Sequence, residues 1–187
     1  MKTIYFLLVN IWFCMSTISI HGQSSIQMSY GKETYKIYKW VAFSGADTSI
    51  AIVNCKNTLD MEKLNECCNC DVRYMGGVSI LQKVMKSVFS QEKQKVFATT
   101  VTPQRIRYAL YYDAANGQIL NVEFELFGVK LSAEDNSPTA VTLKEIYQLE
   151  IQLKSQQLKI EHCDCSKFKY GYDFYSLPLQ KMVQWTE

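Results

Sequence analysis

The residues with the clearest chemical potential in this chain are its cysteines and histidines. The 187 residues include seven cysteines and two histidines. Two short stretches carry most of them, Cys67-Cys68-Asn69-Cys70 and His162-Cys163-Asp164-Cys165. Thiolates and imidazoles act as nucleophiles, as zinc ligands and, for thiols, as disulfide partners. The redox compartment decides among these uses, and the N-terminus indicates that compartment.

Residues 1–22 have the three-part order of a cleavable secretory signal peptide. Lys2 precedes an apolar run from Ile4 to Met15, and a short polar exit ends at Gly22. The run is shorter than the roughly 20 apolar residues that span a bilayer. Cys14 follows bulky residues, unlike the cysteine of a lipoprotein signal. We therefore expect a periplasmic or secreted protein without a lipid anchor or a membrane span after cleavage.

Cleavage after Gly22 leaves six cysteines, and an even number in an oxidising compartment predicts disulfides. Cys67 and Cys68 are poor partners for each other, because neighbouring Cα atoms lie ~3.8 Å apart and a relaxed disulfide prefers about 5.5–6 Å. Bridges from the 67–70 cluster to the other cysteines are the economical arrangement, although the pairing stays open. The candidates are Cys55, Cys67, Cys68, Cys70, Cys163 and Cys165.

Two other uses of these residues are weighed against disulfides. A zinc site would draw its ligands from Cys67, Cys70, His162, Cys163 and Cys165, but the spacing is not the paired C-x-x-C of zinc ribbons. A thiol-based oxidoreductase would use the Cys67 to Cys70 spacing, and a hydrolase would need His162, the single histidine left after cleavage. We expect no metal, no cofactor and no catalytic residue, and keep those two enzymes as the alternative function.

The N-terminal half predicts a flexible leader over 23–34 followed by a β-hairpin. Aromatic and β-branched residues fill 35–43 and 49–53, with a turn between them. Asn57 then caps a short helix over 58–67. Apolar residues at steps of three and four predict an amphipathic helix over 77–90.

The surest element is a second hairpin. Apolar residues alternate along 104–113 and 120–126, and Asn116-Gly117 supplies the positive φ that the turn between them needs. A long loop follows over 127–140, and Thr142 with Glu145 three residues later forms a capping box for a helix. Segments 157–162 and 168–177 are expected to be strands. Residues 35–187 thus predict a single α+β domain, with an antiparallel sheet packed on two amphipathic helices, an N-terminal β-hairpin that joins the sheet and a short helix.

The order helix, hairpin, helix, strand resembles the C-terminal domain of TonB-like energy transducers. Residues 74–81 are similar to that family's aromatic-Pro-Gly-Gly helix start, and residues 106–124, around Asp113 and Asn116-Gly117, are similar to its hairpin. A capped second helix and a terminal strand at Leu177-Pro178-Leu179 complete the likeness, which covers 74–180. The chain also resembles small exported Bacteroidetes proteins of unknown function.

Charge and aromatic content indicate the class of partner. Twenty basic residues against 18 acidic ones give no strong field for nucleic acid. Edge strands recruit extended peptides through backbone hydrogen bonds. We therefore expect a binding module of the bacterial cell envelope, with a protein partner held at a sheet edge or an aromatic face. The binding candidates are Tyr108, Tyr111, Tyr112, Tyr170, Tyr172 and Tyr175.

Overall fold

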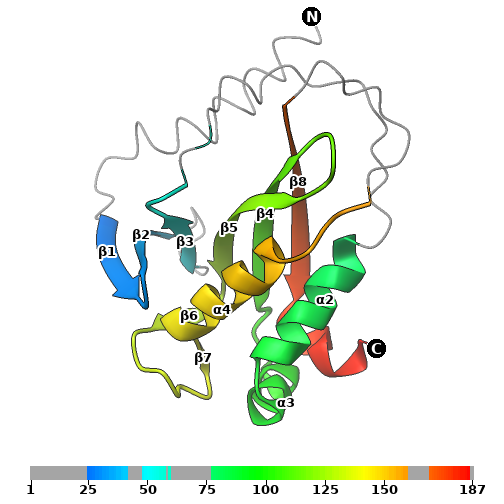
Figure 1. Ribbon diagram of the computed structural model, residues 1–187. Helices are drawn as coiled ribbons and strands as arrows, with labels where there is room; N and C mark the ends of the chain where they lie inside the picture. Colours follow the sequence, from blue (N-terminus) through cyan, green and yellow to red (C-terminus); the bar gives the residue numbers. More distant parts are fainter. Residues whose placement is uncertain (1–24, 42–47, 58, 60–76, 160–168, 186–187) are drawn as a thin grey trace, which may run out of the picture.

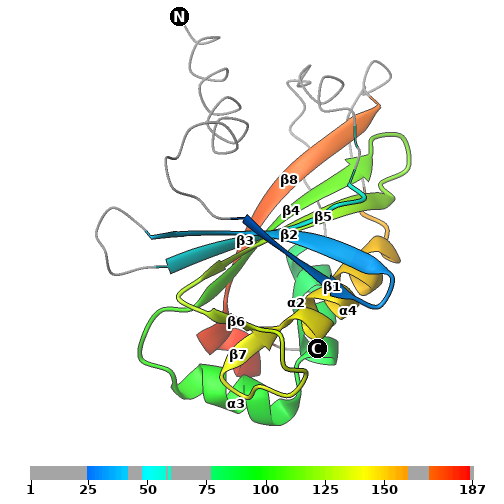
Figure 2. The same ribbon diagram turned by 90° about the vertical axis from the view of Figure 1, so that its left-hand side faces the viewer.

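A computed structural model describes residues 25–41, 48–57, 59, 77–159 and 169–185. These residues form an α+β fold around a six-stranded sheet with strand order β1-β2-β3-β5-β4-β8, and every neighbouring pair in it is antiparallel. Helices α2 and α4 lie side by side on one face of this sheet (Figures 1 and 2). The predicted fold class is thereby confirmed at the level of an α+β domain with a mostly antiparallel sheet.

The N-terminal strands form a meander of three rather than a leader and a hairpin. Strands β2 (Glu33–Val41) and β3 (Thr48–Asn54) are the predicted hairpin. Strand β1 (Ser25–Tyr30) corrects the expectation of a flexible leader over 23–34. Its serines suggested a loop, but Ile26, Met28 and Tyr30 alternate with polar residues, and period two is the strand signal.

The central hairpin has the predicted form. Strands β4 (Arg105–Asp113) and β5 (Ile119–Phe127) pair in antiparallel fashion. Gly117 in the turn has φ of 75°, and its N–H donates to the Asp113 carbonyl oxygen at 2.8 Å. Pairing of β3 with β5 brings the N-terminal meander into the sheet, as expected, and β8 (Tyr170–Pro178) pairs with β4 at the other side.

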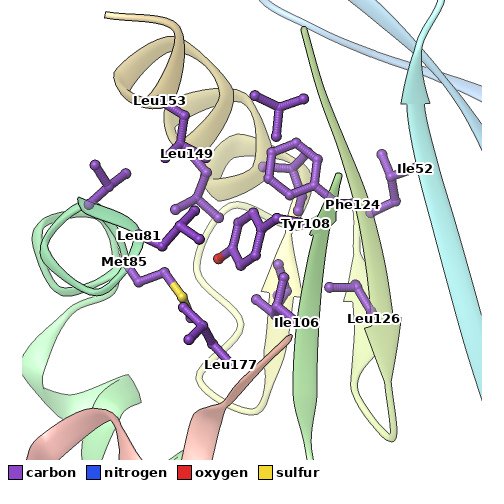
Figure 3. Packing of buried hydrophobic residues seen from close by; sticks show 14 of the residues in the cluster. Ile52, Leu81, Met85, Ile106, Tyr108, Phe124, Leu126, Leu149, Leu153 and Leu177 are labelled. Carbon is purple, nitrogen blue, oxygen red and sulfur yellow. The ribbon is translucent and has the colours of Figure 1, made fainter. Parts of the chain in front are cut away.

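Helices α2 (Gly77–Val88) and α4 (Leu143–Lys154) are the two predicted amphipathic helices. Thr142 Oγ1 accepts from the Glu145 N–H at 3.1 Å, and a Glu145 carboxylate oxygen accepts from the Thr142 N–H at 2.8 Å, so the capping box is present. Leu81 and Met85 of α2 pack toward Tyr108 of β4, with Leu149 and Leu153 of α4 beside them (Figure 3). Period-3.6 and period-2 apolar stripes thus meet in one core.

Several short elements were not predicted. Helix α3 (Gln91–Thr99) starts at Ser90, whose side chain accepts from the Lys93 N–H at 3.2 Å. The expected loop 127–140 contains β6 (Lys130–Ser132), which pairs in parallel with β7 (Ala140–Thr142). The helical turn η2 (Leu179–Gln184) follows β8 and packs against α3.

Other predicted segments are confirmed only in part or lie outside the described residues. In its described part, the strand expected over 157–162 has bridge residues at Gln157, which pairs with Gln118, and at Lys159, and no continuous strand. The signal peptide over 1–22 and nearly all of the helix expected over 58–67 lie outside the described residues. Among the residues that are described, no helix has the length and apolar character needed to cross a bilayer.

Candidate functional site at strand β8

Among the described strands, β8 is one of the two outer strands of the sheet, and its register with β4 fixes which of its backbone groups point away from β4. The Ala114 N–H donates to the Lys169 carbonyl oxygen at 3.1 Å, and the Leu179 N–H donates to that of Gln104 at 2.9 Å. Both pairs continue the β4–β8 register, in which every second pair exchanges hydrogen bonds. Residues 171, 173, 175 and 177 therefore bond to β4, and the backbone groups of Tyr170, Tyr172, Phe174 and Ser176 point away from it.

The same outward-directed residues place aromatic rings on the sheet face opposite the helices. Tyr172 and Phe174 pack edge to face, with ring centroids 4.8 Å apart, and Tyr172 stacks on Tyr111 of β4 at 5.7 Å. Both β8 rings make further contacts within the chain, yet 39% of Tyr172 and 45% of Phe174 stay exposed. Exposed aromatic rings on a rigid strand supply large contact area at low entropic cost.

The structure separates the six predicted tyrosines into different roles. Tyr108 and Tyr112 are buried on the helix side of β4, so the prediction that they line a binding surface is wrong. Tyr111 is buried on the opposite face, where its ring supports Tyr172. Tyr175 is half-buried against the core, where burial is the main cause that raises the pKa of its hydroxyl. Tyr170 and Tyr172 remain at the outer face of β8.

Sequence reasoning missed Phe174, although the signal for it was present. Segment 168–177 was expected to be a strand, and alternation places residue 174 on the same face as Tyr170 and Tyr172. The prediction was limited to tyrosines, so a phenylalanine in the same row was left out.

A glycine on the helix side of β8 lets the strand pair closely with β4. The Tyr112 ring lies against Gly171, where an added Cβ would come within 2.2 Å of the ring. Gly171 is also the register partner of Tyr112. The Tyr112 ring therefore occupies the space that a side chain at position 171 would need.

Charged side chains border the aromatic face on β4 and β5. Arg107 contacts Glu125 at 3.4 Å and lies 4.0 Å from the centroid of the Phe127 ring. Tyr111 donates from its hydroxyl to Glu123 at 3.2 Å. Burial raises the pKa of Glu123 and of Glu125, and these hydrogen-bond partners oppose that shift. Glu123 and Glu125 are therefore partly buried and paired, rather than fully solvated side chains on the strand surface.

Of the sulfur and imidazole candidates, the structure describes one. Cys55 follows β3, is exposed and has a free thiol, in contrast to its predicted disulfide. The other five disulfide candidates and His162, and with them the whole candidate zinc set, lie outside the described residues. No group of three or more metal-binding side chains occurs in the described part of the chain.

Two buried polar clusters lie elsewhere in the fold, and the first surrounds Glu150 of α4. Glu150, 2% exposed, accepts hydrogen bonds from Tyr35 at 2.8 Å, from Asn54 at 3.0 Å and from Lys154 at 2.6 Å. These bonds tie α4 to β2 and β3. Each partner of the carboxylate is a donor within the fold, so the cluster is a structural link.

The second cluster borders a surface pocket of about 390 Å³ near the start of α4. Lys93 of α3 donates to both carboxylate oxygens of Glu145 at 2.7 Å and to the Ala140 carbonyl oxygen at 2.8 Å. Three acceptors saturate the ammonium group. The pair anchors α3 to α4, so these two charges of the pocket wall neutralise each other within the fold.

Comparison with known proteins adds information about the fold. No protein-family model matches the chain, and no curated protein matches it. A crystal structure of a DUF5043 family protein from Bacteroides uniformis is similar, with a TM-score of 0.53 over 83% of this chain and 84% of that one. Sequence identity is 14%, so the likeness is one of fold. The described residues therefore share an architecture with a DUF5043 family protein.

Proposed function

We propose that this chain is an exported interaction module of the bacterial cell envelope, and that an extended segment of a partner protein binds along β8. The observation that carries the proposal is the coincidence of two features on one outer strand. Alternate residues direct their N–H and C=O groups outward, and the same residues present Tyr172 and Phe174 with 39% and 45% of their surface exposed.

The physics of strand addition favours this use. An incoming strand gains affinity from backbone hydrogen bonds and specificity from pockets for alternate side chains. Side chains of one face recur every second residue, about 6.4–6.8 Å apart, so a ligand would set apolar side chains beside the 172 and 174 rings. The expected ligand is an extended segment with apolar residues at alternate positions.

The TonB C-terminal-like character of residues 74–180 belongs to the same proposal. The described elements α2, the β4–β5 hairpin, α4 and β8 follow the order on which the resemblance rests, with α3 inserted after α2. That order supports a shared arrangement of hairpin and terminal strand.

A peptide-display experiment tests the proposal. Random 12-residue peptides would be selected on the purified protein, and an enriched peptide would be titrated by calorimetry. We expect Ser176→Pro to abolish binding, because the Ser176 N–H points outward and proline removes that donor without removing a bond to β4. Ser176→Ala is the matched control and should bind like the parent protein.

Amide exchange locates the bound peptide. Binding should slow amide exchange at Ser176 and leave Asp173 and Tyr175, already bonded to β4, unchanged. Peptides that bind Ser176→Pro as well as the parent, or that protect residues away from β8, would overturn the proposal.

A further inference from the structure

We infer that β1, at the opposite edge of the sheet, is a self-association strand: two copies of the chain pair through β1 about a two-fold axis at Gln27. This inference concerns a different edge from the proposed peptide site. It would join two six-stranded sheets into one continuous sheet.

The hydrogen-bonding pattern of the meander shows which groups of β1 face outward. The Cys55 N–H donates to the Thr34 carbonyl oxygen at 2.8 Å, so even-numbered residues of β2 bond to β3 and odd-numbered ones bond to β1. Tyr35 and Ile37 therefore bond to Met28 and Ile26. The N–H and C=O groups of Ser25, Gln27 and Ser29 point away from β2, and no described strand pairs with that edge.

The side-chain order of β1 reads the same in both directions. Residues 25–29 are Ser-Ile-Gln-Met-Ser, which is serine, apolar, glutamine, apolar, serine about Gln27. An antiparallel partner with the two-fold axis at Gln27 places Ser25 opposite Ser29, Gln27 opposite its own copy, and Ile26 opposite Met28. Each outward N–H then meets a C=O of the second copy. An isologous contact requires this kind of self-complementarity.

The exposed apolar side chain on β1 is also consistent with pairing to a second copy of the chain. Ile26 is 45% exposed, whereas Met28 and Tyr30 on the same face pack partly against the core. In the paired arrangement Ile26 packs beside Met28 of the second copy, and the apolar row continues across the axis. Natural edge strands are commonly protected by charge or proline, and residues 25–30 contain neither.

The size of the contact sets the expected strength. One six-residue strand per copy lies at the small end of specific interfaces, which usually bury about 1,200–2,000 Å². We therefore expect a weak, concentration-dependent dimer. Intact-mass measurement would first establish the N-terminal residue of the purified chain, and sedimentation equilibrium would then measure its association. The weight-average mass should rise from that of one chain toward twice that value.

Three substitutions at Gln27 test the axis. Gln27→Pro removes a donor that points away from β2 and is used by no described strand, and Gln27→Lys or Gln27→Glu sets like charges opposite each other across the axis. Each should weaken dimerisation about tenfold or more. A mixture of Gln27→Lys and Gln27→Glu chains should associate again, because the introduced ammonium and carboxylate then face each other.

Controls keep the outcome clear. Gln184→Lys makes the same chemical change at an exposed residue of η2 and should dimerise like the parent. Circular-dichroism melting checks that each Gln27 variant folds, and the charge variants suffice if the proline variant does not. A parent chain that stays monomeric at every concentration, a dimer indifferent to all three Gln27 substitutions, or mixed charge variants that fail to associate would each overturn the inference.

Discussion

The Tyr112 ring lies against the Gly171 backbone of the neighbouring strand, and no Cβ fits between them. A Cβ placed on Gly171 would be 2.2 Å from the Tyr112 hydroxyl oxygen and Cζ atom. Because Tyr112 is 4% exposed, its ring has little freedom to move aside. A side chain at position 171 would therefore have to displace a buried ring.

Gly171→Ala should therefore lower the free energy of unfolding by about 1–3 kcal/mol, as overpacking does in well-packed cores. Urea unfolding measures the change. Ser176→Ala, on the outer face of the same strand, is the control and should change stability by less than about 0.5 kcal/mol. Adding Tyr112→Leu to Gly171→Ala should cost less than the sum of the two single changes, and simple additivity would contradict the contact.

Tyr35→Phe should destabilise the fold by removing the hydroxyl that donates to Glu150 at 2.8 Å. Both residues are buried, and hydrogen bonds to charged groups contribute about 1.5–3 kcal/mol. Thermal and urea unfolding would show the loss. Tyr38→Phe, on the opposite face of β2, provides a matched control; equal effects from the two changes would argue against a structural role for the Glu150 cluster.

Two glutamates should shift stability with pH in opposite directions. The Asn54 side chain, donating at 3.0 Å, is the largest cause lowering the pKa of Glu33 below its ordinary 4.5, so the ionised form stabilises the fold above that range and the contribution is lost as pH falls. Burial raises the pKa of Glu123, so its ionised form is unfavourable in the fold at neutral pH and protonation at acid pH relieves that cost.

At neutral pH, Glu33→Gln should consequently be less stable than the parent, and Glu123→Gln more stable. Both differences should shrink toward zero as pH falls, because the parent carboxyls are then protonated as well. Urea unfolding between about pH 3 and pH 7 supplies the comparison. Differences of the same sign, or independent of pH, would refute the assignment.

Cys55 should react with iodoacetamide in the folded protein without reductant, because its thiol is exposed and free. Cys55→Ser should remove one adduct from the intact mass. For the cysteine clusters outside the described residues the prediction from export stands: reductant lowers the melting temperature, and a chelator leaves it unchanged. A melting point that falls with the chelator alone would favour zinc.

Local signals in the sequence were sufficient for the central hairpin and the two long helices. Alternation on both sides of Asn116-Gly117, the capping box of Thr142 and Glu145, and the apolar stripe of α2 each depend on residues close in the chain, so they could be read before the fold was known. Helix α3 was not predicted because its 91–99 segment has few apolar residues. Its buried Lys93 is paired with Glu145, which lies 52 residues away in the sequence.

The outer faces and edges of the sheet were decided by tertiary structure. Alternation places Tyr108 and Tyr112 on one face of β4 and Tyr111 on the other, but residues 108 to 112 are all buried, so it could not show which face the helices cover. Pairing of β3 with β5 and of β4 with β8 then left β1 and β8 outermost among the strands that the structure describes. Strand order depends on contacts between residues far apart in the chain, and a local sequence period carries no information about them.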